Sequence, residues 1–194
     1  IYNRLCFTEK LSPHLLHVAP DLRSRVIILN GASKTYAMTG WRIGWALGPK
    51  PVITAMSNYQ SQSVSCPSAS GQYGALEGIL KGDADVAKTV DVLKDKRDTI
   101  LKELAKIPGV KTVVPEGAFY LWVGIKAYLG KKYKGTTVES SADLCRVLLE
   151  ERLVAAVPGV EFGLEGYLRL SYALDKEQGK EAIARLAALL SEFT

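Results

Sequence analysis

Lys34 and Arg42 are the two residues whose types and surroundings could do chemistry. Lys34 follows the apolar run at residues 26–29 and lies next to Ser33. Proximity to an apolar core disfavours the charged ammonium form, and a neutral amine can attack a carbonyl carbon. Arg42 stands at the start of a second apolar stretch, where its guanidinium group requires an anionic partner such as a phosphate. A ligand that needs both an amine and a phosphate clamp is pyridoxal 5′-phosphate (PLP).

Strands and helices must position this segment. The continuous apolar runs at residues 26–29 and 42–47 are typical of strands buried on both faces of an α/β sheet. A short helix is expected before them, near residues 13–18, with Pro13 in its first turn. Apolar residues at helical spacing follow and predict three helices, over residues 51–62, 68–81 and 83–106.

The second half of the chain has a different pattern. Ser140 and Asp143 are spaced as in a capping box at the start of a helix, and a last helix is expected from Asp175. The basic segment 131–135 is expected to be a solvated loop. Short apolar segments separated by turns predict strands over residues 110–114, 118–123, 153–157 and 167–173.

Three motifs resemble those of the class I and II aminotransferases. Residues 31–44 read Gly-Ala-Ser-Lys-Thr-Tyr-Ala-Met-Thr-Gly-Trp-Arg-Ile-Gly and are similar to the PLP-lysine signature of the family, in its aspartate-aminotransferase-like form. Tyr2, with Leu5 and Phe7, resembles the motif whose tyrosine contacts the cofactor. Residues 167–173 resemble the strand whose arginine binds the substrate. The resemblance extends over essentially the whole chain.

The resemblance implies a PLP-dependent amino-acid aminotransferase and a role for each motif residue. Lys34 is then the catalytic Schiff-base lysine and the general base and acid of the reaction. Ser33 and Arg42 hold the phosphate of PLP, and Tyr2 binds its 3′-oxygen. Arg169 binds the α-carboxylate of the substrate. The expected substrates are an amino acid and a 2-oxo acid, of the aspartate and 2-oxoglutarate type, and the expected enzyme is a cytoplasmic homodimer.

The expected fold is α/β. It comprises the C-terminal part of the fold type I large domain, with an incomplete mixed sheet, and an α+β small domain. We place the boundary inside the long helix, with domains at residues 1–86 and 87–194. The aspartate that pairs with the pyridine nitrogen in the family stands three residues before the tyrosine, which falls before Ile1. We therefore expect a C-terminal half that transaminates little or not at all by itself and exposes apolar sheet edges.

Two other functions remain open at this point. One is a PLP-dependent carbon–sulfur β-lyase on the same scaffold, which would release pyruvate and ammonia instead of transferring an amino group. The other is a non-catalytic aminotransferase-like effector domain of a transcription regulator, in which a winged-helix segment would be attached.

Composition narrows the class of protein. The chain has 194 residues, of which 47% are hydrophobic and 23% charged, and this excludes a disordered chain. Its apolar runs are too short for a membrane span, and a diffuse net charge of +5 does not indicate nucleic-acid binding. Cys6, Cys66 and Cys145 lack metal-site spacing and are expected to be buried, in a reducing compartment. His14 and His17 have no further ligands nearby in the sequence, so no metal site is expected.

Overall fold

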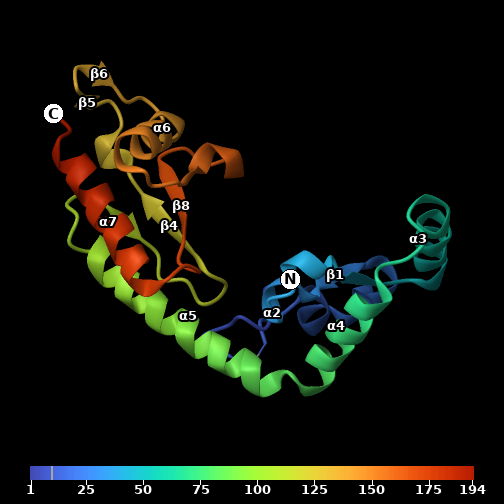
Figure 1. Cartoon of the computed structure of the whole chain (residues 1–194). Helices are drawn as coiled ribbons and strands as arrows, with labels where there is room; N and C mark the ends of the chain where they lie inside the picture. The colour runs from blue at the N-terminus through green and yellow to red at the C-terminus, as the bar shows by residue number, and fades with distance from the viewer. Residues whose placement is uncertain (10) are drawn as a thin grey trace. The chain divides into compact units, whose positions relative to one another are not determined.

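The computed structural model describes residues 1–9 and 11–194, and these divide into two compact units (Figure 1). The units are Ile1–Asp91 and Val92–Thr194. The division lies inside helix α5 (Asp83–Leu104), the element in which we place a domain boundary near residue 86. Each unit has buried apolar side chains of its own, so each is described separately.

The first unit is built on a two-stranded antiparallel sheet. Strand β1 (Ile28–Gly31) pairs with β2 (Gly44–Leu47), and Gly31 lies opposite Gly44. Between them the chain forms the short helix α2 (Ala32–Thr35) and a 3₁₀ turn, η2 (Thr39–Trp41). Both strands begin two residues later than their apolar runs, so Arg42 precedes β2 instead of starting it. Arg42 has left-handed backbone geometry, with φ 56°, which a strand residue does not adopt.

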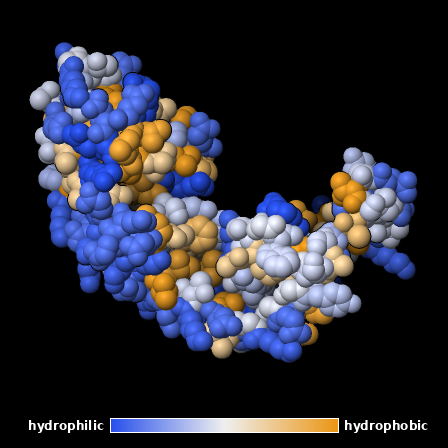
Figure 2. Space-filling model, in the orientation of Figure 1, coloured by the Kyte–Doolittle hydropathy of each residue, from blue (hydrophilic) through white to orange (hydrophobic). Residues whose placement is uncertain are grey.

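Each face of this small sheet carries an exposed leucine. Leu29 is 69% exposed and Leu47 is 58% exposed. The apolar run predicts a strand inside a larger sheet that is covered on both faces. In the described residues the sheet has only two strands, each with one neighbour, and these side chains are exposed to solvent. The expectation of exposed apolar sheet residues is thus confirmed. Figure 2, which colours residues by hydropathy, shows hydrophobic residues (orange) at the surface of the molecule.

The first unit also contains four helical segments: α1 (Leu15–Val18), η1 (Pro20–Arg25), α3 (Lys50–Ser63) and α4 (Ala69–Lys81). Pro13 lies outside α1, because the side chain of His14 caps the helix by accepting the N–H of Leu16. Helix α4 approaches the sheet closely at Gly71, where an added Cβ would lie 2.9 Å from Cδ1 of Ile43. This contact places α4 over the core around Ile43 and Ala75.

The second unit contains a four-stranded antiparallel sheet in the order β3-β4-β8-β7. Its strands are β3 (Lys111–Thr112), β4 (Tyr120–Gly124), β7 (Val157–Pro158) and β8 (Tyr167–Ser171). Side chains alternate between faces, so Leu121, Val123, Leu168 and Leu170 are buried on one of them. The strand expected at residues 153–157 is shorter than its apolar run, and Leu153 adopts left-handed geometry at the end of the preceding helix.

Helices and a hairpin complete this unit. Helix α6 (Ser141–Arg152) begins with the expected capping box, since Ser140 and Asp143 bind each other's backbone N–H groups. The basic segment forms a hairpin of β5 (Lys132–Tyr133) and β6 (Thr136–Thr137), not a fully solvated loop. Tyr133 is only 4% exposed because it packs beside Phe193. Two 3₁₀ turns remain, η3 (Lys126–Tyr128) and η4 (Gly159–Phe162).

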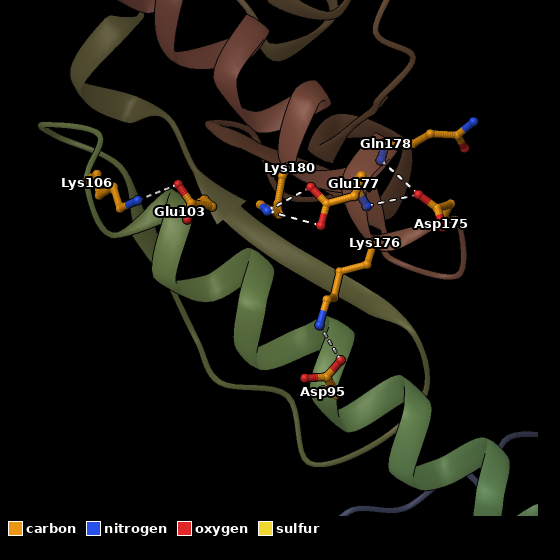
Figure 3. Close-up of polar contacts among 8 residues, drawn as sticks. All are labelled: Asp95, Glu103, Lys106, Asp175, Lys176, Glu177, Gln178 and Lys180. Carbon is orange, nitrogen blue, oxygen red and sulfur yellow. Dashed lines mark hydrogen bonds and ion pairs between the residues drawn. The ribbon is translucent and has the colours of Figure 1, made fainter.

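The last helix, α7 (Lys176–Ser191), is fixed against α5 at its start (Figure 3). Asp175 caps it by accepting the N–H groups of Glu177 and Gln178. Lys176 pairs with Asp95 of α5 at 2.8 Å. The two helices touch at Gly179, where an added Cβ would lie 2.8 Å from Cδ1 of Ile100.

Within the described residues, no helix is both long and apolar enough to cross a membrane. No group of three or more His, Cys, Asp or Glu side chains there could hold a metal ion. The cysteines differ from the expectation of burial: Cys145 is buried, Cys6 is half-buried and Cys66 is exposed. Cys66 lies in the link between α3 and α4, outside either helix, so no core forms around it.

Candidate functional site

The turn from β1 into α2 positions Lys34. The N–H of Ala32 donates to the carbonyl of Ile43 at 3.0 Å, which holds the start of α2 against the chain entering β2. Gly31 allows this approach, because an added Cβ would lie 3.0 Å from the same carbonyl oxygen. Ser33 and Lys34 follow in α2, and both are half-buried. Lys34 therefore lies at the margin of the core, not within it.

The N-terminal segment lies against the end of β1 and brings Tyr2 to this region. The Asn30 side chain donates to Oδ1 of Asn3 at 3.0 Å and accepts the N–H of Gly31 at 2.8 Å. A Cβ added to Gly31 would also lie 3.6 Å from the Ile1 side chain. Tyr2 is half-buried between these two anchored neighbours.

Arg4 is a residue of this region that sequence reasoning missed. Its Nη1 donates to the Tyr36 hydroxyl at 3.1 Å, and its Nη2 pairs with Asp83. Burial disfavours the charged guanidinium, but hydrogen bonds to Asp83 and Tyr36 more than compensate, so the pKa of Arg4 is raised. Arg4 thus ties the N-terminal segment to α2 and to the start of α5. No sequence signal marks this contact, because the partners are far apart along the chain.

Arg42 lies beyond η2 and is exposed. Its Nη1 donates to the carbonyl of Thr39 at 2.7 Å, which leaves the other guanidinium donors for a ligand. Helix α2 and turn η2 are in contact with each other. Tyr2, Ser33, Lys34 and Arg42 thus all lie on or beside the segment that connects β1 with β2.

Arg169 belongs to the second unit and lies in β8 directly opposite Trp122 of β4. It is half-buried. Its Cζ lies over two aromatic rings, 4.5 Å from the centroid of Tyr120 and 4.7 Å from that of Phe162. In the part of the chain that the structure describes, no carboxylate pairs with it. A half-buried guanidinium that pairs with no carboxylate of the protein can donate hydrogen bonds to the carboxylate of a ligand.

Four aromatic residues, which we call the aromatic cluster, gather around Arg169: Tyr120, Trp122, Phe162 and Tyr167. Trp122 stacks on Tyr167 with centroids 5.4 Å apart and meets the ring of Phe162 edge-on at 5.6 Å. Sequence reasoning missed this cluster. Alternation along β4 could have placed Tyr120 and Trp122 on one face, but nothing local to Phe162 indicates that η4 brings it there.

Comparison with known proteins identifies the family. The family model "Aminotransferase class I and II" matches residues 1–186. An aspartate aminotransferase of Streptomyces avermitilis is 43% identical over 192 residues, which are 99% of this chain and 47% of the relative. An aspartate/prephenate aminotransferase of Nitrosomonas europaea is 41% identical over 92% of this chain and 45% of its own length.

Solved structures agree with the sequence relatives. The crystal structure of an aspartate aminotransferase from Rhizobium meliloti superposes with a TM-score of 0.93 at 38% identity, over 100% of this chain and 49% of that protein. An aromatic aminotransferase from Pyrococcus horikoshii gives a TM-score of 0.86 at 31% identity, over 99% of this chain and 50% of that protein. The chain therefore spans about half the length of these relatives. It has their fold over that span, and it belongs to the class I and II aminotransferase family.

Proposed function

We propose that this chain is the part of a PLP-dependent aminotransferase that carries the cofactor lysine and the substrate-carboxylate arginine. The observation that carries this proposal is that Arg169, within the described residues, pairs with no carboxylate. The other buried or half-buried arginines, Arg4, Arg97, Arg152 and Arg185, each pair with a carboxylate of the chain. Arg169, within the described residues, contacts aromatic rings instead, and so remains available to a carboxylate ligand.

The residues of the first unit suit PLP. Lys34 supplies a primary amine for the aldehyde of the cofactor, and Arg42 supplies guanidinium donors for its phosphate. Ser33 adds a hydroxyl next to the lysine, and the phenol of Tyr2 can donate to the 3′-oxygen. When bound, PLP supplies a conjugated ring that stabilises negative charge on the substrate Cα. The donor set thus matches the aldehyde, the phosphate and the ring hydroxyl of the cofactor.

The protein's own residues then perform binding and proton transfer. Arg169 binds the α-carboxylate of the amino acid through two parallel N–H donors, which orients the Cα–H bond. With PLP held in place, the Nζ of Lys34 would act as the base that accepts the proton of Cα and then as the acid that returns a proton. Arg42 and Ser33 keep the phosphate fixed during this exchange. Bound PLP would supply the acceptor for the amino group, and with water consumed the substrate would be released as a 2-oxo acid.

We propose aspartate as the amino donor and 2-oxoglutarate as the acceptor, in a cytoplasmic homodimer. The names of the relatives support an acidic donor, since the Streptomyces avermitilis protein is an aspartate aminotransferase. Helix α3 supports an assembly, because Val52, Met56 and Tyr59 on it are exposed apolar or aromatic side chains. Three free cysteines are in keeping with a reducing compartment.

A chimera tests the function. In it, this chain replaces the matching segment of the Streptomyces avermitilis relative. We expect the chimera with PLP to convert aspartate and 2-oxoglutarate to glutamate, and the Lys34→Ala chimera to lose both this activity and the visible absorbance of the bound cofactor. Release of pyruvate and ammonia from an S-alkylcysteine, with no glutamate formed from aspartate and 2-oxoglutarate, would instead favour the β-lyase.

A second measurement covers a chimera that does not fold. The chain itself is incubated with PLP, reduced with borohydride and digested, and the labelled lysines are identified by mass spectrometry. We expect Lys34 to be labelled ahead of the exposed Lys50. Equal labelling of the two lysines would contradict the role of Lys34 as the cofactor lysine and with it the proposed function.

A further inference from the structure

We propose that Tyr120 and Phe162 are positioning residues, which hold the guanidinium of Arg169 ready for a carboxylate without occupying its hydrogen-bond donors. This inference rests on the proposed function, in which Arg169 binds the α-carboxylate. The two rings lie 4.5 Å and 4.7 Å from the Cζ of Arg169. Both distances are within the range in which a cation is attracted to the face of an aromatic ring.

Aromatic rings can hold the guanidinium of Arg169 in a way that a carboxylate of the chain cannot. A carboxylate of the chain would fix Arg169 through the same N–H donors that the substrate needs, so the two would compete. A ring attracts the cation through its π-face and leaves these donors free. Arg4 shows the alternative, in which a structural arginine uses its N–H donors on groups of the protein, here Asp83 and the Tyr36 hydroxyl.

Tyr120 can hold Arg169 because its own place is fixed. It lies in β4 opposite Ser171 of β8, on the same face of the sheet as Arg169. The residue before it is anchored as well, since the N–H of Tyr172 donates to the carbonyl of Phe119 at 3.0 Å. The hydroxyl of Tyr172 donates to the carbonyl of Ala118 at 3.0 Å. Strand pairing thus brings a rigid ring to the guanidinium.

Phe162 reaches Arg169 from a tight turn. It ends η4, and the next residue, Gly163, has a φ of 77° that glycine adopts without strain. The turn closes through the N–H of Leu164, which donates to the carbonyl of Gly159 at 3.1 Å. The ring also contacts the edge of Trp122. Phe162 remains 49% exposed, a large exposure for a phenylalanine, and this is expected if a ligand completes its surroundings.

The test uses succinate, a plain dicarboxylate, and the 194-residue chain. Binding is followed by the NMR signal of the Arg169 Nε–H group. We expect Tyr120→Leu and Phe162→Leu each to weaken succinate binding by about two- to five-fold, the loss that one exposed cation–π contact predicts. Phe162→Tyr keeps a ring face and should restore binding. Tyr59→Leu, at a tyrosine that is 78% exposed in the first unit, is the matched control and should bind as the wild type does.

A kinetic readout separates positioning from folding. In the chimera, Phe162→Leu should raise the KM for aspartate and for 2-oxoglutarate by the same factor and leave kcat unchanged, because the lost contact acts on binding. Backbone NMR signals of the four-stranded sheet should stay in place in both leucine variants. Succinate binding and KM that are unchanged in both variants would overturn the inference while the proposed function stands. An inactive, folded chimera whose succinate binding still depends on the rings would overturn the proposed function alone.

Discussion

Arg42 and Arg169 are both cations available to a ligand, but they are held in different ways. Arg42 is exposed and uses one donor on the carbonyl of Thr39, in a left-handed turn that fixes its backbone. Arg169 is half-buried among rings. The guanidinium fork can bind a phosphate or a carboxylate through two parallel hydrogen bonds. The proposed function assigns a phosphate to the exposed Arg42 and a carboxylate to Arg169.

Replacing Arg42 should weaken cofactor binding without removing the reactive amine. Loss of charge-assisted hydrogen bonds to a phosphate costs about 1.5–3 kcal/mol, so Arg42→Ala should raise the Kd of PLP in the chimera by about 10- to 150-fold. Arg42→Lys should recover part of this loss, because lysine keeps the charge but not the fork. Fluorescence titration measures the Kd. Arg23→Ala, at an exposed arginine of η1, is the control, and equal Kd values in the two alanine variants would argue against a phosphate at Arg42.

The thiols of Cys66 and Cys145 should react at very different rates. Burial raises the pKa of Cys145 to about 11, with the charge of Glu165 as a smaller cause. At pH 8 almost none of Cys145 is therefore the reactive thiolate, and the thiol is also buried. Iodoacetamide should label the exposed Cys66 in the native chain and reach Cys145 only after unfolding, as mass spectrometry of peptides would show. Native labelling of Cys145 at the rate of Cys66 would show that α6 opens readily.

The sequence suggests candidate site residues more readily than the contacts that support them. Lys34, Arg42 and Arg169 stand in contiguous motifs, so local sequence alone is enough to propose them as site residues. The contact between Arg4 and Asp83 joins residues 79 positions apart, and its charges look like ordinary surface charges. Phe162 likewise depends on how η4 packs against β4. Such contacts are set by the tertiary fold, which the local pattern does not encode.

Helices were predicted more closely than strands. The ranges 51–62 and 68–81 correspond to α3 and α4 within two residues at every end, because helical spacing and end signals are local. Strands are defined by pairing. The run at 153–157 therefore yields only β7, which meets β8 over two residues. The burial of β1 was also overestimated, since it depends on neighbouring strands that the apolar run cannot supply.

The capping box at the start of α6 is expected to stabilise this helix in a pH-dependent way. A hydrogen bond from Ser140 lowers the pKa of Asp143, so the carboxylate is favoured in the folded state. Its contribution is then present above the unfolded pKa of about 3.8 and is lost as the pH falls through the lower folded pKa. Ser140→Ala should cost about 1 kcal/mol of unfolding free energy at pH 7. The difference from wild type should shrink below pH 3.8.

Urea unfolding at a series of pH values measures this difference. Ser140→Thr retains a hydroxyl that can cap the helix, and it should stay close to the wild type at every pH. Asp143→Asn removes the charge and should flatten the pH dependence of stability in this range. A Ser140→Ala cost that stays constant from pH 7 to pH 2.5 would show that Asp143 takes no part in the cap.

The two units of the chain bury their residues to different degrees. In the second unit, Leu121, Val123 and Leu168 of the central strand pair are at most 1% exposed. In the first unit, β1 and β2 pair only with each other and expose Leu29 and Leu47. A two-stranded sheet is marginal in water unless other elements cover it. The relatives are about twice as long as this chain, so in them further chain accompanies the matched half.

Hydrogen exchange should therefore distinguish the units. The free energy of local opening ranges from near zero to the free energy of global unfolding within one protein. It is larger where the backbone is buried and paired with neighbouring strands. We expect the paired amides of β1 and β2 to exchange at least about 100-fold faster than those of β4 and β8, a difference of about 2.7 kcal/mol in opening free energy. Mass spectrometry of peptides from the native chain measures both.

Leu29→Lys, which removes an exposed leucine, should leave the protection of β4 and β8 unchanged, because β1 is outside the second unit. Equal protection of the two strand pairs would contradict this expectation and would mean that β1 and β2 open as rarely as β4 and β8.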